Sequence, residues 1–307
     1  MRYDQEHPCF DFYFLEKFGI TPEEVKKFSR DNYDKFLSLC KAKDKTICMT
    51  RDKNTEWVFR TYNATKMIMA ATLLLNNADY CMSKNVMVPV PYLLYYAAFS
   101  SARAFFCASP FAQKKLEYIA APTHTKVLKE VPDLIKKHVD REIGEKIELL
   151  LNYLRNQREL FSYKFPASGI RDQVRFDETV DMCGLLAELT ELSSYKIQEV
   201  YEKRIINNTP HETEKEYDWM SLNQDMLEKL YNFDTVNIFG EKISLIDDED
   251  CYRVGYINRK VKHPSSIMFT MTEGMTEDFF GSWYDFENSD DDSFNPDANW
   301  NRIFPIP

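Results

Sequence analysis

The stretch VPYLLYYAAFSSARAFF, residues 90–106, decides the fold of this chain. Between Pro91 and Phe106 its only charged residue is Arg103, and the other residues are aromatic, aliphatic or small. The stretch is too short to span a bilayer, which needs about 20 consecutive apolar residues. A helix that is apolar on nearly all sides is normally buried on all sides. We therefore predict that residues 90–108 form the central helix of a mostly α-helical core.

The overall composition supports a globular protein with a large core. The chain has 307 residues, of which 44% are hydrophobic and 14% aromatic, and both values are typical of folded domains. Its 8 glycines argue against glycine-rich phosphate loops. The seven cysteines are scattered without a Cys-x-x-Cys pair, which favours reduced thiols in a cytosolic protein. Without an apolar leader or a long apolar segment, we predict a cytoplasmic protein that does not contact membranes.

The net charge of −10 is concentrated at the C-terminal end. Nine acidic residues and no Lys or Arg lie between Pro264 and Asn301, so the rest of the chain is almost neutral. The acidity therefore argues only weakly against a nucleic-acid partner, because a basic face on the body would still attract phosphate. No metal-ligand spacing of His and Cys is present, and we expect neither a metal nor a cofactor.

Apolar periodicity and capping residues predict several more helices. The clearest start is Thr21-Pro22-Glu23-Glu24, which has the sequence of a capping box. Helices are expected at residues 22–39, 56–83, within 110–122, from 123 onward, and at 142–161, 177–205 and 219–230. Residues 1–20 are expected to form a strand or an irregular arm, and residues 41–54 a loop with a short strand at 46–49.

The composition changes after residue 206, where strand-like alternation begins. Strands are predicted at residues 235–239, 242–246, 252–259 and 266–271. We therefore predict three parts: an N-terminal arm and helix (1–55), a helical bundle (56–206), and a small α/β extension with an acidic, aromatic tail (207–307). The tail has two readings. In the first, its acids and aromatics dock on a basic partner, mimic nucleic acid, or fold back over a basic groove and occupy it. In the second, its aromatics pack on the domain while the acids stay in water.

Three segments of the predicted bundle carry a resemblance to a known family. Residues 95–106 (YYAAFSSARAFF) look like a family helix of the form Y-Y-A-x-F-x-A-x-R-A-L-L. Residues 123–127 (THTKV) are similar to a T-H-S-G-V segment, and residues 158–163 (RELFSY) to an R-x-x-A-D-Y ending. In this order and spacing, residues 57–205 resemble the HEPN superfamily of helical bundles, with overall features of its YaaC-like branch.

The resemblance implies a function in bacterial defence or toxin–antitoxin systems. Active HEPN ribonucleases cleave RNA without metal, using an Arg, a following polar residue and a nearby His from each protomer of a dimer. Arg155-Asn156 matches the start of this motif, but Leu160, Phe161 and Ser162 occupy the positions expected for His. Imidazole is the group best suited to acid–base work near neutral pH. We therefore expect a degenerate, binding or regulatory member, homodimeric through its bundle, with RNA, a nucleotide or a protein as partner.

The candidate site lies at the end of the helix 142–161. Arg155, Asn156 and Arg158 would bind phosphate, to which a planar guanidinium is well matched; alternatively they lie on a solvated face and pair with Glu159. If the protein is an endoribonuclease, the two arginines would steady the phosphate while His124 or Tyr163 moves protons.

Two further residues have both a functional and a structural reading. His124 would either supply the missing imidazole or bond to the backbone near Pro122. Arg103 would either contribute to phosphate binding from a polar pocket beside Ser100 and Ser101, or form a salt bridge with an acid of a neighbouring helix, because an unpaired buried charge is costly.

Overall fold

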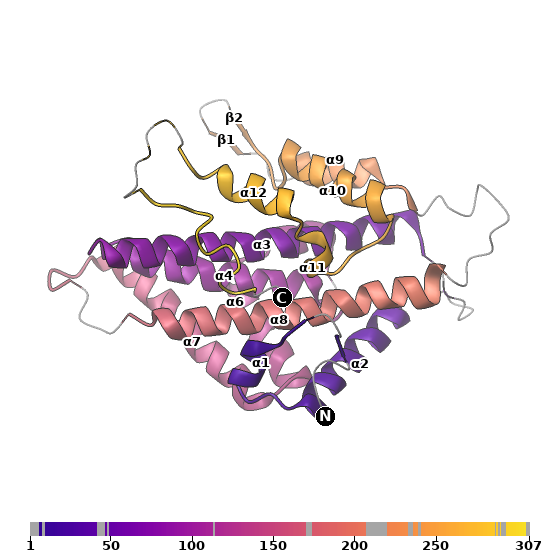
Figure 1. The fold of residues 1–307 in the computed structure, drawn as a ribbon, viewed down its shortest axis with the longest axis horizontal. Coiled ribbons are helices and arrows are strands. Elements are labelled where there is room, and N and C mark those ends of the chain that lie inside the picture. The colour runs from indigo at the N-terminus through magenta and orange to yellow at the C-terminus, as the bar shows by residue number, and fades with distance from the viewer. Residues whose placement is uncertain are drawn as a thin grey trace.

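The computed structural model is mostly helical, as the sequence predicts (Figure 1). It describes residues 6–7, 10–41, 47, 49–112, 114–169, 174–206, 220–232, 236–238, 241–285, 287, 289 and 293–304. Long helices form an elongated bundle; α10–α12 lie along one side of it against α3, and α1 and α2 lie against α8 on the opposite side (Figure 1). No helix in these residues is both long enough and apolar enough to cross a bilayer.

The elements of the bundle follow in chain order. The helices are α1 (Tyr13–Lys17), α2 (Pro22–Leu39), α3 (Arg51–Ser83), α4 (Val90–Ala108), α5 (Leu116–Ala120), α6 (His124–His138), α7 (Arg141–Glu159) and α8 (Phe176–Val200). Short π-helical turns, Leu160–Lys164 and Tyr201–Ile205, extend α7 and α8. The C-terminal elements are α9 (Gln224–Asn232), β1 (Val236–Ile238), β2 (Glu241–Ile243), α10 (Asp248–Val261), α11 (Ile267–Thr270) and α12 (Glu273–Gly281).

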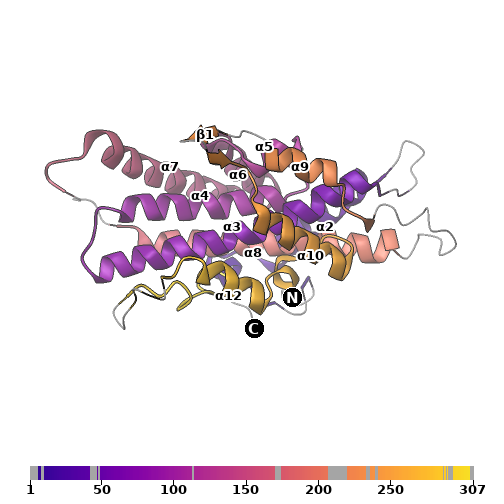
Figure 2. The same cartoon turned by 90° about the horizontal axis from the view of Figure 1, so that it is seen from above.

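Helix α4 is the centre of the bundle, and its predicted bounds are confirmed. It contacts α3, α6, α7 and α8, and α3, α4 and α7 run along the long axis of the molecule (Figure 2). Small residues such as Ala97 and Ala98 are completely buried, so neighbouring backbones approach closely while Phe105 and Phe106 fill the space between them.

Capping explains where two long helices begin. The capping box predicted for α2 is present: Thr21 Oγ1 accepts from the backbone N–H of Glu24, whose carboxylate accepts from the N–H of Thr21. Helix α3 begins at Arg51, five residues before the predicted start, because Thr50 caps it by accepting from the N–H of Lys53. Four residues assigned to a loop therefore belong to the first turn of α3.

The buried Arg60 joins α3 to the end of α4. Its Nε donates to the carbonyl of Cys107 at 2.8 Å and its Nη2 to the carbonyl of Ser109 at 2.7 Å. Nη1 lies 3.1 Å from the Glu56 carboxylate, and the guanidinium stacks 3.9 Å from the Trp57 ring centroid. The side chain thus satisfies carbonyls that the end of a helix leaves without intrahelical donors.

The predicted strands of the C-terminal part are only partly correct. Residues 236–238 and 241–243 form an antiparallel hairpin, with Val236 opposite Ile243. The strand predicted at 252–259 is wrong, because this segment lies in α10, whose first turn is fixed by a capping box between Asp247 and Asp250. The strand predicted at 266–271 is also wrong, because α11 occupies it.

The remaining local predictions differ in detail. The N-terminal arm contains the short helix α1 rather than a strand. Lys41 and Ile47 form an isolated antiparallel bridge near the predicted strand 46–49, of which Thr46 and Cys48 lie outside the described residues. The helix predicted at 219–230 is found as α9, shifted toward the C-terminus.

Several aromatics of the C-terminal tail pack on the domain, whereas Trp283 is 63% exposed. Phe280 and Phe304 are completely buried. Two ion pairs attach the same segment: Arg302 reaches Asp79 of α3 at 2.6 Å, and Asp278 pairs with Arg253 of α10. Of the two readings of the tail, packing is the one observed for these residues, whereas the acids at 290–292 lie outside the described part.

Candidate functional site

Three segments of the bundle meet at one cluster of cationic and aromatic side chains. Residues 95, 99 and 103 of α4 recur at helical spacing and so share one face of that helix. His124 is the first residue of α6, and Arg155 and Arg158 lie in the last turns of α7. We use the term Arg–His–Tyr cluster for Tyr95, Tyr96, Phe99, Arg103, His124, Arg155 and Arg158.

The imidazole of His124 is held by aromatic residues of α4. Its Nδ1 lies 2.6 Å from the hydroxyl of Tyr95. Its ring stacks on Phe99, with 4.1 Å between ring centroids and 10° between planes, and meets the edge of Tyr96 at 5.9 Å. The predicted alternative of a bond to the backbone near Pro122 is therefore wrong, because Tyr95 takes the ring nitrogen instead.

Arg158 contacts the same two tyrosines. Its guanidinium carbon lies 4.8 Å from the centroid of the Tyr95 ring, and Nη1 is 3.5 Å from the Tyr96 hydroxyl. Nη2 lies 3.6 Å from the Glu159 carboxylate. The buried Nε–H of Arg158 has no hydrogen-bond partner in the described part of the chain. This N–H is therefore an unsatisfied buried donor, which is uncommon in folded proteins.

Arg155 lies at the more exposed edge of the cluster. Its Nε donates to Glu159 at 2.8 Å, so the predicted pairing with Glu159 is confirmed for both arginines. Asn156 is exposed on the solvent side of α7. Tyr163 is 81% exposed, and among the described residues no hydrogen bond or ring contact joins it to His124. The structure thus brings His124, Arg155 and Arg158 together and leaves Tyr163 without such a contact.

Arg103 lies on the same face of α4 as Phe99, one helical turn further toward the C-terminus. Its Nη2 donates to the carbonyl of Ala120 at 2.7 Å, and its guanidinium carbon is 5.9 Å from the Phe99 ring centroid. No carboxylate lies within salt-bridge distance among the described residues, so the predicted salt bridge is wrong. The last carbonyl of the short helix α5 replaces the acid, because a helix end offers an unsatisfied acceptor.

The electrostatics of the cluster favour a neutral imidazole and a neutral phenol. Burial lowers the pKa of His124, and the positive charges of Arg158, Arg103 and Arg155 lower this pKa further. Burial raises the pKa of Tyr95. At neutral pH both His124 and Tyr95 are therefore uncharged. The cluster contains three guanidiniums and the one carboxylate of Glu159, and this excess of positive charge attracts anions.

The sequence did not assign the aromatic part of this site. Tyr95, Tyr96 and Phe99 were expected only as core residues of the central helix, yet they position both His124 and Arg158. Their spacing in the helix was visible in the sequence. The packing of α6 and α7 against that face depends on tertiary structure and was not.

The three other histidines in the described residues have separate structural partners, and His211 lies outside those residues. His7 Nε2 lies 2.8 Å from Glu191, His138 stacks on Phe111, and His263 Nδ1 lies 2.9 Å from the carbonyl of Pro264. No group of three or more His, Cys, Asp or Glu side chains suited to a metal ion occurs within the described residues. Comparisons with protein-family models, with curated proteins and with solved structures find no match to this chain.

Proposed function

We propose that this chain is a HEPN-like helical-bundle protein whose Arg–His–Tyr cluster binds phosphodiester groups of RNA. The observation that carries the proposal is that His124 and Arg158 both contact Tyr95. These three residues come from the three segments on which the resemblance rests, and they are 29 or more positions apart in sequence. Their convergence supports a shared role better than three isolated surface features would.

If Tyr95 donates the hydrogen bond that it shares with His124, the site is suited to binding phosphate and His124 is not a catalytic base. A neutral phenol that donates to Nδ1 leaves the single N–H proton of the neutral imidazole on Nε2. In that tautomer Nε2–H is a hydrogen-bond donor and cannot accept a proton from substrate. Together with the guanidiniums of Arg155 and Arg158 it forms a set of donors suited to phosphate oxygens.

By the same resemblance, we infer a binding or regulatory role in a bacterial defence or toxin–antitoxin system. A homodimer formed through the bundle would place two such clusters on one assembly, and a second protein of the system would act as its partner. These inferences extend the phosphate-binding proposal and do not alter its test.

RNA binding is measured by fluorescence anisotropy with a labelled single-stranded RNA at several salt concentrations. Arg158→Ala should weaken binding about tenfold and reduce the salt dependence by roughly one phosphate contact. The matched control is Arg141→Ala at the other end of α7, where the side chain is largely exposed and forms an ion pair with Glu145. Circular dichroism establishes that both variants remain helical. Equal binding by all three proteins would refute the proposed site.

Metal-independent RNA cleavage is a second candidate function, favoured by the neutral state of His124. If Nδ1–H donates to the Tyr95 oxygen, Nε2 is free to accept the proton of a ribose 2′-hydroxyl. The resulting 2′-oxygen would attack the adjacent phosphate and form the O–P bond of a cyclic phosphate. The 5′-oxygen–phosphorus bond would break, with water returning a proton to the 5′-oxygen and the arginines stabilising the phosphate charge.

This second function predicts a specific product. Purified protein is incubated with RNA in the presence of a chelator, and 2′,3′-cyclic phosphate ends are measured by mass spectrometry. Cleavage by the wild type that is lost in His124→Ala and Arg155→Ala would establish it. Intact RNA with all proteins at high concentration would exclude it and leave the binding role.

A further inference from the structure

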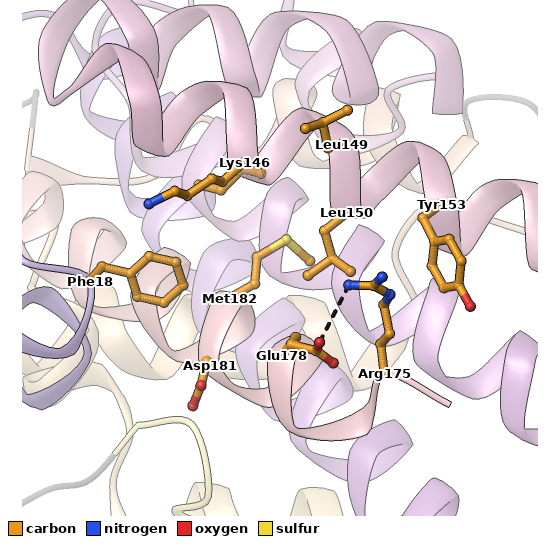
Figure 3. Close-up of a pocket in the computed structure, with 10 residues that line it drawn as sticks. Phe18, Lys146, Leu149, Leu150, Tyr153, Arg175, Glu178, Asp181 and Met182 are labelled. Atoms are coloured by element: carbon orange, nitrogen blue, oxygen red, sulfur yellow. Dashed lines mark hydrogen bonds and ion pairs between the residues drawn. The ribbon is translucent and has the colours of Figure 1, made fainter. Parts of the chain in front are cut away.

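An apolar groove lies between α7 and α8, away from the residues of the Arg–His–Tyr cluster (Figure 3). Its volume is about 590 Å³, within the range of sites that bind small organic molecules. Leu149, Leu150 and Tyr153 of α7 form one side, and Met182 of α8 and Phe18 form the other. Leu149 is 72% exposed at the rim, which is unusual for a large aliphatic residue next to other apolar surface.

The charged residues of the groove are not equivalent. Asp181 pairs with Lys17 at 2.6 Å, and Glu178 pairs with Arg175 at 3.3 Å, so both carboxylates on the α8 side are already neutralised (Figure 3). Lys146, on the α7 side, has no ion-pair partner among the described residues. The groove therefore offers an apolar floor with one available positive charge at its edge.

We propose that this groove binds a single-chain amphiphile with one carboxylate, of the class of medium-chain fatty acids. The hydrocarbon chain lies along Leu150, Tyr153 and Met182, and the carboxylate faces the ammonium of Lys146. Burial of the chain supplies most of the affinity because apolar area leaves water. Lys146, the cation without an ion-pair partner among the described lining residues, supplies the choice of head group, because a cationic head would lie beside it without an available carboxylate.

Charge also argues against a second copy of this chain as the occupant. A two-fold interface presents the same patch from both partners. It would bring two Lys146 ammonium groups into one apolar interface, while Glu178 and Asp181 remain engaged in their own ion pairs. Uncompensated like charges in such an interface are costly.

The test compares two ligands of equal chain length by isothermal titration calorimetry below their critical micelle concentrations. Wild-type protein should bind decanoate about two- to fivefold more tightly than decyltrimethylammonium, as expected for one partly exposed ion pair. Lys146→Glu should reverse this preference. Lys129→Glu, an equivalent charge reversal at an exposed position of α6, should leave it unchanged. Each methylene added between octanoate and decanoate should tighten binding by up to about fourfold.

Three outcomes would overturn the proposal. The first is no saturable binding of either amphiphile. The second is a preference for decanoate that survives Lys146→Glu, which would place the carboxylate elsewhere. The third is a wild-type dimer in light scattering that Leu149→Glu converts to a monomer, which would identify the groove as a self-association surface. All variants are at exposed positions, and circular dichroism verifies that they fold.

Discussion

The buried guanidinium of Arg60 should be one of the largest single contributors to the stability of the bundle. The side chain is 1% exposed and donates to two carbonyls at the end of α4, those of Cys107 and Ser109, while it also contacts Glu56. Arg60→Leu retains apolar volume but leaves both carbonyls without these donors. Glu56 is partly exposed and recovers hydration, so its cost is small.

The expected decrease in the free energy of unfolding follows from the cost of burying carbonyls without hydrogen-bond donors. Each buried carbonyl that loses its donor costs about 1–3 kcal/mol, and loss of the contact with the Trp57 ring adds to this. Part of this free energy is recovered, because the variant no longer has to desolvate a charged guanidinium. We expect Arg60→Leu to lower the free energy of unfolding by about 4 kcal/mol, a large share of the ~5–15 kcal/mol typical of folded domains.

Urea denaturation followed by circular dichroism measures this change as a shift of the midpoint at constant slope. The control Arg141→Leu removes an arginine that is 83% exposed and should change stability by less than about 0.5 kcal/mol. A loss below about 1 kcal/mol for Arg60→Leu would refute the argument that Arg60 satisfies the end of α4.

Three other predictions concern the buried carboxyl of Glu188, the close contact at Gly184 and the pKa of His124. Burial raises the pKa of Glu188 from 4.5 to about 8; since the folded state then holds a proton that the unfolded chain releases, the stability should fall between about pH 4.5 and 8, by up to ~5 kcal/mol. Urea melts at both ends of this range should show a smaller fall for Glu188→Gln, and an equal fall would contradict the assignment. Gly184→Ala would place a Cβ 2.3 Å from Phe14 of α1, so thermal denaturation should show a free energy of unfolding lower by about 2 kcal/mol. The control Gly255→Ala, where the nearest atom would be 3.4 Å from the new Cβ, should leave this free energy unchanged. The pKa of His124, followed by NMR, should lie below its usual value and rise in Arg158→Ala, because a nearby positive charge is removed; Arg141→Ala should leave it unchanged.

Local sequence signals predicted those parts of the fold that depend on local interactions. The capping box at Thr21 and the apolar stretch of α4 were readable because their partners lie within a few residues. The segment 252–259 misled because Tyr252, Val254 and Tyr256 alternate like a strand. Val254 and Ile257 are the apolar residues buried there, and they lie three positions apart as on a helix.

Buried polar residues are the main class whose position could not be predicted from sequence periodicity. Glu188 lies in an apolar helix and would be assigned to a surface, yet it is completely buried and accepts the backbone N–H groups of Phe14 and Leu15. Glu191, nearly one turn later, binds His7 and the N–H of Met268. Both contacts join segments far apart in sequence, so no local periodicity could reveal them.

The same distinction applies to the candidate site. Sequence motifs selected His124, Arg155 and Arg158, and tertiary packing added Tyr95, which contacts the first and the last of these. Tyr95 also bears on the choice between the two proposed functions, because the direction of its hydrogen bond with Nδ1 determines whether Nε2 donates or accepts a proton. A buried phenol with a raised pKa remains protonated and has a proton to donate, and the surrounding arginines disfavour a second proton on the imidazole. Both effects keep the phenol and the imidazole uncharged, and either tautomer satisfies them. We place phosphate binding before cleavage because the guanidiniums of Arg155 and Arg158 bind phosphate in both tautomers, whereas cleavage requires the tautomer in which Nε2 accepts a proton.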